Sequence, residues 1–496
     1  MPRATSRVPL LVAVAVGLTG VAAAVHYANA GLTVSHYDAR AHLVVARRIF
    51  DSLFPGWQQV GGVWLPLPHL LNMIPVQVDA WYRSGASAVA ISVLSMATAA
   101  WALSSMLIRT TGSRIAAAAG AVLLMGNPNL LYLQSTPMTE PLLFATTLLA
   151  IMWTAAWLDE NPSSGWMKPG LALAAACMTR YEALPITAAI IALACAVLLR
   201  RGASYAAVRR AAVRLAVFPM LALALFTLNS RWTMGLWFIP RDFFVPENIE
   251  ALGRPLEAWR QVHVGLHELS GTALVWAAYA GLALSGLAFV RSRARAPLVL
   301  VAALAAAAIL PWYAYLQGHP FRIRYDVPLV VAASALSACG VALLPALVRP
   351  FAAVAVVAAA LIQAAPLDRS APLIVESQRD ARNMEGRRAV TAYLARHYDG
   401  GGILASMGSL AHYMHDLSHA GFRIRDFVHE GNGELWPYAL GGARAVVGWV
   451  LIEEQAEGGD ALWHQQRRSE KFLAGFERVA EGGGVALYRV TRVNAE

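Results

Sequence analysis

The sequence predicts a polytopic α-helical membrane protein with a small α/β domain at its C-terminus. Apolar stretches of about membrane-spanning length recur from the N-terminal region to about residue 366. Only 14% of the residues are charged and 57% are hydrophobic, whereas soluble domains are about a quarter charged. Beyond residue 366 these apolar runs stop. A large soluble core is disfavoured, because so many apolar helices would have no polar face to expose to water.

The apolar stretches divide into eleven predicted membrane spans. The first has basic flanks, as a signal peptide would, but no polar domain follows it directly, so we expect a retained anchor helix. The fifth and sixth spans are short and could together form one bent helix. The predicted spans cover residues 8–29, 87–108, 114–133, 141–158, 168–180, 183–199, 211–230, 272–290, 296–316, 325–347 and 350–365.

Basic residues in the short loops predict the orientation, because cytoplasmic loops are enriched in Lys and Arg. With eleven spans all basic clusters fall on one face, whereas a single span over residues 168–199 would put the later clusters on the other. We therefore expect a protein of the cytoplasmic (inner) membrane with its N-terminus in the cytoplasm. The net charge of +10 is explained by these loops and does not indicate a nucleic-acid partner.

Two long outer loops are predicted, residues 30–86 and 231–271. In the first, residues 39–54 have apolar positions at helical spacing, with Arg40 and Arg47 on the opposite face. Such a helix is typical of the membrane interface, where its basic face meets lipid phosphates. A plain surface helix has the same pattern.

The predicted domains are a membrane domain, residues 1–366, and a soluble extracytoplasmic domain, residues 367–496. In the second, alternating helices and strands indicate an α/β fold. Its Gly-rich turns lack the lysine of a nucleotide-binding loop. The predicted elements are a helix at 377–398, strands at 402–406 and 445–452, a helix at 460–475 and a strand at 485–490.

Candidate chemical groups lie in segments at the outer ends of the spans. A carboxylate at a membrane boundary is costly unless it is used. Carboxylates can take the proton of a hydroxyl nucleophile, and arginines bind phosphate and stabilise its developing charge. This combination favours transfer from a lipid phosphate to a hydroxyl acceptor. The segments are residues 36–42 and 64–69, 136–142, 178–184 and 319–329.

Structural explanations exist for the same residues. The alternatives are an N-cap for Asp38, a first-turn helix acid for Glu140, a mutual pair for Arg180 and Glu182, contact with lipid headgroups for Arg322 and Arg324, and a place in the membrane interface for His42 and His69.

The order of these segments resembles the GT-C superfamily of integral-membrane glycosyltransferases, which includes protein O-mannosyltransferases and bacterial lipid A aminoarabinose transferases. In that family an acidic residue in the first outer loop precedes a helix and a Pro-Pro-Leu-like element. Here these are Asp38, residues 39–54 and Pro66-Leu67-Pro68. A second acid precedes a Pro-Leu pair, as in Glu140-Pro141-Leu142. The resemblance covers about residues 8–350.

Two further motifs match, and one position departs. The family's Thr-Arg/Lys element resembles Thr179-Arg180-Tyr181-Glu182, and its Arg-Tyr-hydrophobic-Pro element resembles Arg324-Tyr325-Asp326-Val327-Pro328. Many relatives have two adjacent acids in the first loop, where this chain has Asp38-Ala39. This departure weakens the case for a metal site built on paired carboxylates.

The resemblance implies an inverting glycosyltransferase that moves a hexose or pentose from a polyprenyl-phosphate donor to a lipid, glycan or protein hydroxyl at the extracytoplasmic face. No cofactor is certain, and a divalent metal, Mg²⁺ or Mn²⁺, stays open. A ligase-like enzyme using a pyrophosphate-linked glycan is one alternative, and a lipid or solute transporter is another. The implied site has Asp38 as general base, Glu140 as a second acid that positions the acceptor, Arg180, Arg322, Arg324 and Tyr325 at the donor phosphate, and His36, Tyr37, His42, His69, Glu182 and Arg241 in support.

Overall fold

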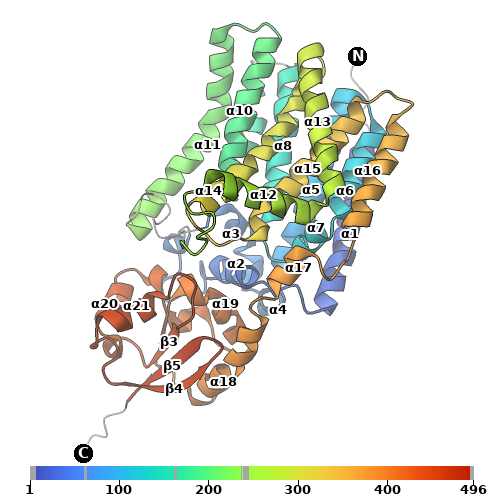
Figure 1. Cartoon of the computed structure of the whole chain (residues 1–496). Helices are drawn as coiled ribbons and strands as arrows, with labels where there is room; N and C mark the ends of the chain where they lie inside the picture. The colour runs from blue at the N-terminus through green and yellow to red at the C-terminus, as the bar shows by residue number, and fades with distance from the viewer. Residues whose placement is uncertain (1–6, 61–63, 161–164, 236, 238–244, 492–496) are drawn as a thin grey trace, which may run out of the picture.

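A bundle of long helices forms one end of the molecule and a mixed α/β region forms the other (Figure 1). The computed structural model describes all residues except 1–6, 61–63, 161–164, 236, 238–244 and 492–496. The short helices of the first outer loop lie where the two parts meet (Figure 1).

Among the described residues, eight helices are long and apolar enough to cross a membrane, which confirms the polytopic prediction. Three shorter apolar helices coincide with the other predicted spans, so the count of eleven stays a prediction. The long helices are α1 (Val8–Asn29), α5 (Ala86–Thr111), α8 (Glu140–Glu160), α10 (Ala183–Arg200), α11 (Tyr205–Met234), α13 (Thr272–Arg291), η4 with α14 (Ala296–Ala308, Ile309–Leu316) and η5 with α15 (Ile323–Asp326, Val327–Leu343). The shorter ones are α6 (Arg114–Gly126), which α7 (Pro128–Leu133) follows, α9 (Met167–Cys177) and α16 (Arg349–Gln363).

Helix α15 is the centre of the bundle. The span that contains it is 94% buried, against 22% for α1 at the periphery. Helix α13 approaches it closely at Gly281, where an added Cβ would collide with the backbone carbonyl of Leu336. Small residues let membrane helices pack backbone to backbone. This contact fixes the position of α15, which begins directly after Arg324 and Asp326.

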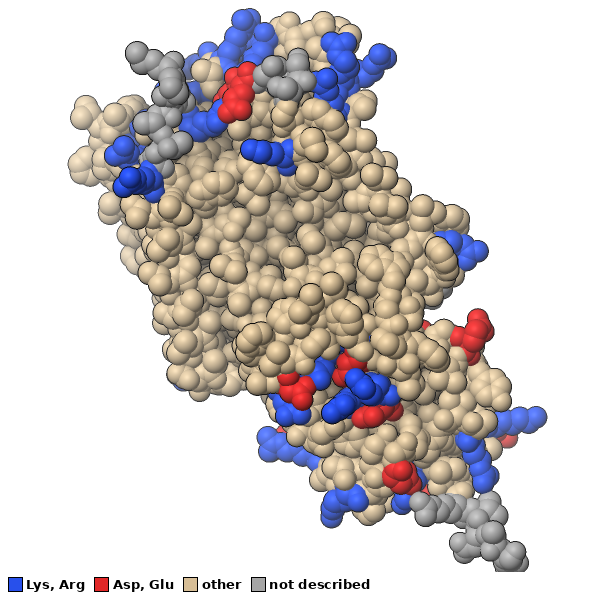
Figure 2. Space-filling view, turned by 180° about the vertical axis from the view of Figure 1, so that it is seen from behind, with Lys and Arg blue, Asp and Glu red and all other residues tan. Residues whose placement is uncertain are grey.

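The predicted basic loops gather at one end of the bundle. Arg109 and Arg201 both pair with Asp159, at 3.9 and 2.6 Å, and Arg201 also donates to the carbonyl of Arg293. On the face shown in Figure 2, Lys and Arg crowd the end far from the α/β region, and a broad band with few charges follows. The fifth and sixth predicted spans are separate helices, α9 and α10.

The outer loops contain short helices, and the first of them differs from the prediction. Helix α2 ends at Arg47 rather than at residue 54, because the chain turns there. Helix α12 lies across the lower end of the bundle (Figure 1). These helices are α2 (Tyr37–Arg47), α3 (Leu67–Asn72), α4 (Asp79–Ser84), α12 (Pro255–Ser270) and α17 (Pro372–Ser377).

The basic residues of α2 do not face lipid headgroups, so the predicted interfacial role of this helix is wrong. Arg40 is 1% exposed, and its guanidinium lies 2.6 Å from Asp380 and 2.6 Å from Asp416. Arg47 pairs with Asp79 at 2.5 Å. The two carboxylates that bind Arg40 lie 340 and 376 residues further along the sequence, so the helical pattern around Arg40 cannot reveal them.

The α/β region contains a five-stranded sheet of order β2-β1-β3-β5-β4. Strand β1 is parallel to β2 and β3, and β5 is antiparallel to β3 and β4. Each predicted helix and strand has a counterpart, but α19, α20, β2 and β4 were not predicted. The elements are α18 (Ala381–His397), β1 (Ile403–Ala405), α19 (Met407–Ser418), β2 (Phe427–Val428), α20 (Leu435–Gly441), β3 (Trp449–Glu453), α21 (Ala461–Arg468), β4 (Phe476–Gly482) and β5 (Val485–Val490).

Helix α2 completes the core of the α/β region. Its Leu43 and Val44 are fully buried in one apolar cluster with Leu410 and Leu417 of α19 and Ile403 of β1. The α/β region therefore packs on the first outer loop. The predicted division of the sequence into two domains at residue 366 stays a prediction.

Candidate functional site

Five of the residues singled out in the sequence form one chain of ion pairs. Arg324 lies 2.5 Å from Asp38 and 3.4 Å from Glu140, and Arg180 lies 3.1 Å from Glu140 and 2.6 Å from Glu182. These residues come from three outer loops and the start of α8. The folding of the bundle thus brings together groups that are up to about 290 residues apart in sequence. We call them the carboxylate–arginine chain.

Asp38 owes its position to the cap of α2. The cap is His36, whose Nδ1 accepts a hydrogen bond of 3.1 Å from the backbone N–H of Asp38. Asp38 itself stands in the first turn, with its carboxylate turned to Arg324. The alternative of Asp38 as N-cap is therefore wrong, and its side chain is available for other contacts.

Glu140 is the first residue of α8 and is fully buried. It lies within ion-pair distance of Arg180 and Arg324. However, neither carboxylate oxygen has a hydrogen-bond donor aligned to it among the described residues. A buried carboxylate is held by the charge of its neighbours when hydrogen bonds are lacking. Glu140 thus binds both arginines electrostatically and keeps its oxygens open to a further donor.

Arg180 is fixed by several partners at once. It donates to Glu182 through Nε and Nη2, at 3.1 and 2.6 Å, and to the hydroxyl of Thr139 at 3.1 Å. The mutual pair of Arg180 and Glu182, considered above as a structural alternative, is present, but Arg180 also pairs with Glu140. A guanidinium with its donors in a fixed fork is suited to recognising a planar or tetrahedral anion.

The charges of the chain do not balance. Three carboxylates (Asp38, Glu140 and Glu182) face two guanidiniums (Arg180 and Arg324), so the formal sum is −3 + 2 = −1. Burial alone raises the pKa of Asp38, but Arg324 and His36 outweigh it and hold that pKa below its ordinary value. Asp38 is therefore ionised at neutral pH.

Arg322 and Tyr325 stand beside this chain with other partners. The Nη2 of Arg322 pairs with Glu457 of the α/β region. The Tyr325 hydroxyl lies 3.2 Å from Nε2 of His319, and its ring lies 5.9 Å from the guanidinium of Arg324. Tyr37 packs its ring on His36, with centroids 4.7 Å apart. Arg322 and Arg324 thus have different ion-pair partners, although only one residue stands between them in sequence.

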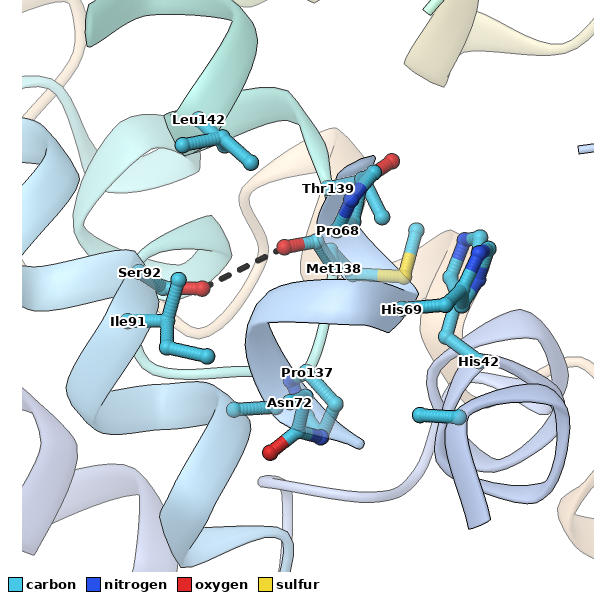
Figure 3. A pocket seen from close by; sticks show the side chains of 12 residues that line it. His42, Pro68, His69, Asn72, Ile91, Ser92, Pro137, Met138, Thr139 and Leu142 are labelled. Carbon is cyan, nitrogen blue, oxygen red and sulfur yellow. Dashed lines mark hydrogen bonds between the residues drawn. The ribbon is translucent and has the colours of Figure 1, made fainter. Parts of the chain in front are cut away.

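His42 and His69 line a small cavity next to the carboxylate–arginine chain (Figure 3). Nδ1 of His42 lies 3.0 Å from Nε2 of His69, and the ring of Trp64 packs at a tilt against His42, with centroids 4.0 Å apart. The cavity encloses about 20 Å³, enough for about one water molecule. Its wall includes Met138 and Thr139 (Figure 3), and these residues contact Arg324 and Arg180.

Burial keeps both histidines neutral. It lowers the pKa of His69 to about 3, and burial together with His69 lowers the pKa of His42. One ring therefore donates and the other accepts in the hydrogen bond between them. The polar end of this cavity is thus lined by neutral imidazoles. The nearest charged groups, Arg180 and Arg324, contact the outer side of the wall residues Thr139 and Met138.

Sequence reasoning missed Glu376, which belongs to α17 of the C-terminal part. Its carboxylate is 4% exposed and lies 4.0 Å from Nε2 of His36. It also missed the buried ion pairs that Arg40 makes with the α/β region. No local pattern marks Glu376 as part of the site. Arg241, the remaining predicted site residue, lies outside the described residues.

The fold is that of a known membrane enzyme. The crystal structure of ArnT from Cupriavidus metallidurans bound to undecaprenyl phosphate superposes with a TM-score of 0.53 at 12% sequence identity, over 95% of this chain and 97% of that one. ArnT is a GT-C lipid A aminoarabinose transferase. No protein-family profile and no curated protein matches the sequence. The expected GT-C fold is therefore confirmed.

Proposed function

We propose that this protein is a glycosyltransferase that uses a polyprenyl-phosphate sugar as donor and a hydroxyl group as acceptor. The observation that carries the proposal is the carboxylate–arginine chain at one end of the bundle, in a fold shared with an enzyme bound to undecaprenyl phosphate. The chain supplies a carboxylate for a proton and guanidiniums for a phosphate, which are the two groups that such a transfer needs.

In the proposed reaction Asp38 takes the proton of the acceptor hydroxyl while the acceptor oxygen attacks the anomeric carbon. The bond from that carbon to the phosphate oxygen breaks, and its electron pair stays on the leaving polyprenyl phosphate. A direct displacement of this kind inverts the anomeric configuration. Arg324 and Arg180 lie close enough to Asp38 and Glu140 to meet the phosphate at the same site.

In this proposal Glu140 holds the side chains of Arg180 and Arg324 in fixed positions relative to each other. It is the only described residue whose carboxylate lies within ion-pair distance of both Arg180 and Arg324. Preorganised charges stabilise a transition state because they do not have to reorganise as the reaction proceeds. His36 and Glu182 orient the outer members of the chain.

We propose that the reaction needs no divalent metal. The oxygens of Asp38 and Glu140 already face guanidiniums, which would repel a cation. No cluster of three His, Cys, Asp or Glu side chains among the described residues could hold a metal ion. Full activity in excess chelator is the expected result. Loss of activity that Mg²⁺ or Mn²⁺ restores would instead favour the ligase-like reaction with a pyrophosphate donor.

The proposed location is the cytoplasmic membrane, with the site and the α/β region outside. The basic end of the bundle, which contains Arg109 and Arg201, then lies in the cytoplasm. Labelling of single cysteines with an impermeant reagent in intact cells tests this. A cysteine in the α/β region should react, and one in the loop between α10 and α11 should not.

The direct test is transfer by the purified protein in proteoliposomes. Hexose- and pentose-loaded polyprenyl phosphates are offered with lipid, glycan and protein hydroxyl acceptors from a bacterial envelope. The proposal expects release of polyprenyl phosphate in step with a new glycoside. Transport of a labelled solute or lipid, with no new glycoside from any donor, would contradict it and support a transporter.

A further inference from the structure

The ion pair between Asp38 and Arg324 presents an obstacle to the proposed chemistry. At 2.5 Å the guanidinium neutralises the carboxylate that should take a proton. The same guanidinium is needed by the donor phosphate. While the two side chains hold each other, the carboxylate is a weaker base and the guanidinium is shared.

We infer that the donor phosphate opens this pair: it takes Arg324 as its counter-ion and releases Asp38, so that Asp38 acts as a base only in the donor complex. This inference rests on the proposed function and adds how its site is switched on. In the arrangement of the structure, the pair with Arg324 masks Asp38 as a base.

The charge count supports the exchange. Both arginines of the carboxylate–arginine chain are already committed, and the chain as a whole has an excess of carboxylate. A phosphate that approaches a guanidinium therefore competes with one of the three carboxylates for it. Within the carboxylate–arginine chain, both guanidiniums already have carboxylate partners when the phosphate arrives.

Burial decides which carboxylate yields. Glu140 is fully buried and the side chain of Glu182 is 2% exposed, whereas the side chain of Asp38 is 13% exposed. A carboxylate left without a partner costs far less next to water than in the interior. Asp38 is thus the member that separates from its arginine at the smallest cost.

Arg324 also lies next to the wall of the small cavity. The Sδ atom of Met138, in the wall of the cavity next to His69, lies 3.9 Å from Nη1 of Arg324. Methionine is flexible, with three rotatable bonds, and adapts to a new neighbour. A shift of this side chain would bring the guanidinium to the surface of the cavity shown in Figure 3.

The exchange joins the two halves of the reaction. With Arg324 on the phosphate, the carboxylate of Asp38 gains proton affinity because its strongest opposing charge has left. It accepts the proton of the acceptor hydroxyl as the acceptor oxygen bonds to the anomeric carbon. The departing phosphate gains a second negative charge, and Arg324 is already beside it. One arginine thus serves first the base and then the leaving group.

Binding of undecaprenyl phosphate to detergent-purified protein tests the exchange without catalysis. If Asp38 competes with the phosphate for Arg324, Asp38→Asn should bind the lipid about fivefold to tenfold more tightly than wild type, the effect of one charge-assisted contact near the surface. Arg324→Gln should bind it more weakly.

A matched control separates this competition from a general change in charge. Asp79→Asn removes one carboxylate from the same outer loop, where its partner is Arg47 and not Arg324, and it should leave the affinity unchanged. Asp38→Ser repeats the test with a different side chain and should also bind more tightly. Equal or weaker binding by both Asp38 variants would overturn the exchange. Absence of binding by wild type would overturn the proposed function itself.

Discussion

Removal of the buried Arg40 guanidinium should loosen the α/β region from α2. Arg40 is 1% exposed and lies 2.6 Å from each of two carboxylates, Asp380 and Asp416. Breaking a buried ion pair by removing one partner costs about 3–5 kcal/mol. The side chain of Asp416 is 22% exposed and Asp380 keeps Arg387 at 3.3 Å, so we expect Arg40→Met to cost about 3 kcal/mol, the lower end of that range.

The assay is thermal unfolding of the detergent-solubilised protein, followed by tryptophan fluorescence. Trp449 in β3 is fully buried in the core that α2 completes, and it should report this transition. A loss of about 3 kcal/mol corresponds to a fall in Tm of about 6–12 °C for a unit of 150–250 residues. The control is Arg388→Met, an exposed arginine on the same helix as Arg387, which should melt with wild type.

Two results would refute this reasoning. The first is an Arg40→Met protein with the same Tm as Arg388→Met. Equal melting would mean that Asp380 and Asp416 do not need the charge of Arg40. The second concerns the double variant Arg40→Met, Asp416→Asn. Because it removes both sides of the Arg40–Asp416 pair and leaves Asp380 with Arg387, it should recover part of the stability. A further loss would mean that packing of the arginine stem, and not its charge, matters.

Three further changes have defined outcomes. Burial raises the pKa of Glu453 from 4.5 to about 7 against the opposing charge of Arg387. The unfolded chain releases this proton first, so stability should fall as the pH rises from about 4.5 to about 7, and Glu453→Gln should lack that decline in urea titrations. Gly281→Leu should separate α13 from α15, because the backbone of Leu336 fills the space, and the purified variant should aggregate in size-exclusion chromatography. Glu457 is 39% exposed, so Glu457→Gln should change the free energy of unfolding by less than about 1 kcal/mol; a larger change would contradict the view of this ion pair as a surface contact.

The membrane architecture could be predicted because it depends on local sequence. Long apolar runs predict helices wherever they occur in a membrane, and α1, α5 and α8 begin and end within about three residues of the predicted spans. Their position at the outer ends of predicted spans also marked Asp38, Glu140 and Arg324 as costly charges. The predicted topology then indicated that these residues lie at the same depth, at the outer surface of the membrane.

Contacts between distant segments could not be predicted. The helical pattern of residues 39–54 indicated a basic face for lipid, but Asp380 and Asp416 occupy Arg40 from a different part of the fold. Asp38 looked like a cap because it precedes an apolar run, whereas His36 takes that place two residues earlier. Strand β2 has two residues and depends on its partner β1 for its existence, so it leaves no pattern of its own.

The central claim is that Asp38 removes the proton of the acceptor. It is tested most directly by the single-turnover rate of sugar transfer, with donor bound beforehand and acceptor in excess. Asp38→Asn should lower this rate by about 10²–10⁴-fold, the contribution of a general base, while the variant still binds undecaprenyl phosphate at least as tightly as wild type. A correctly folded Asp38→Asn protein that transfers sugar at the wild-type rate would contradict the claim.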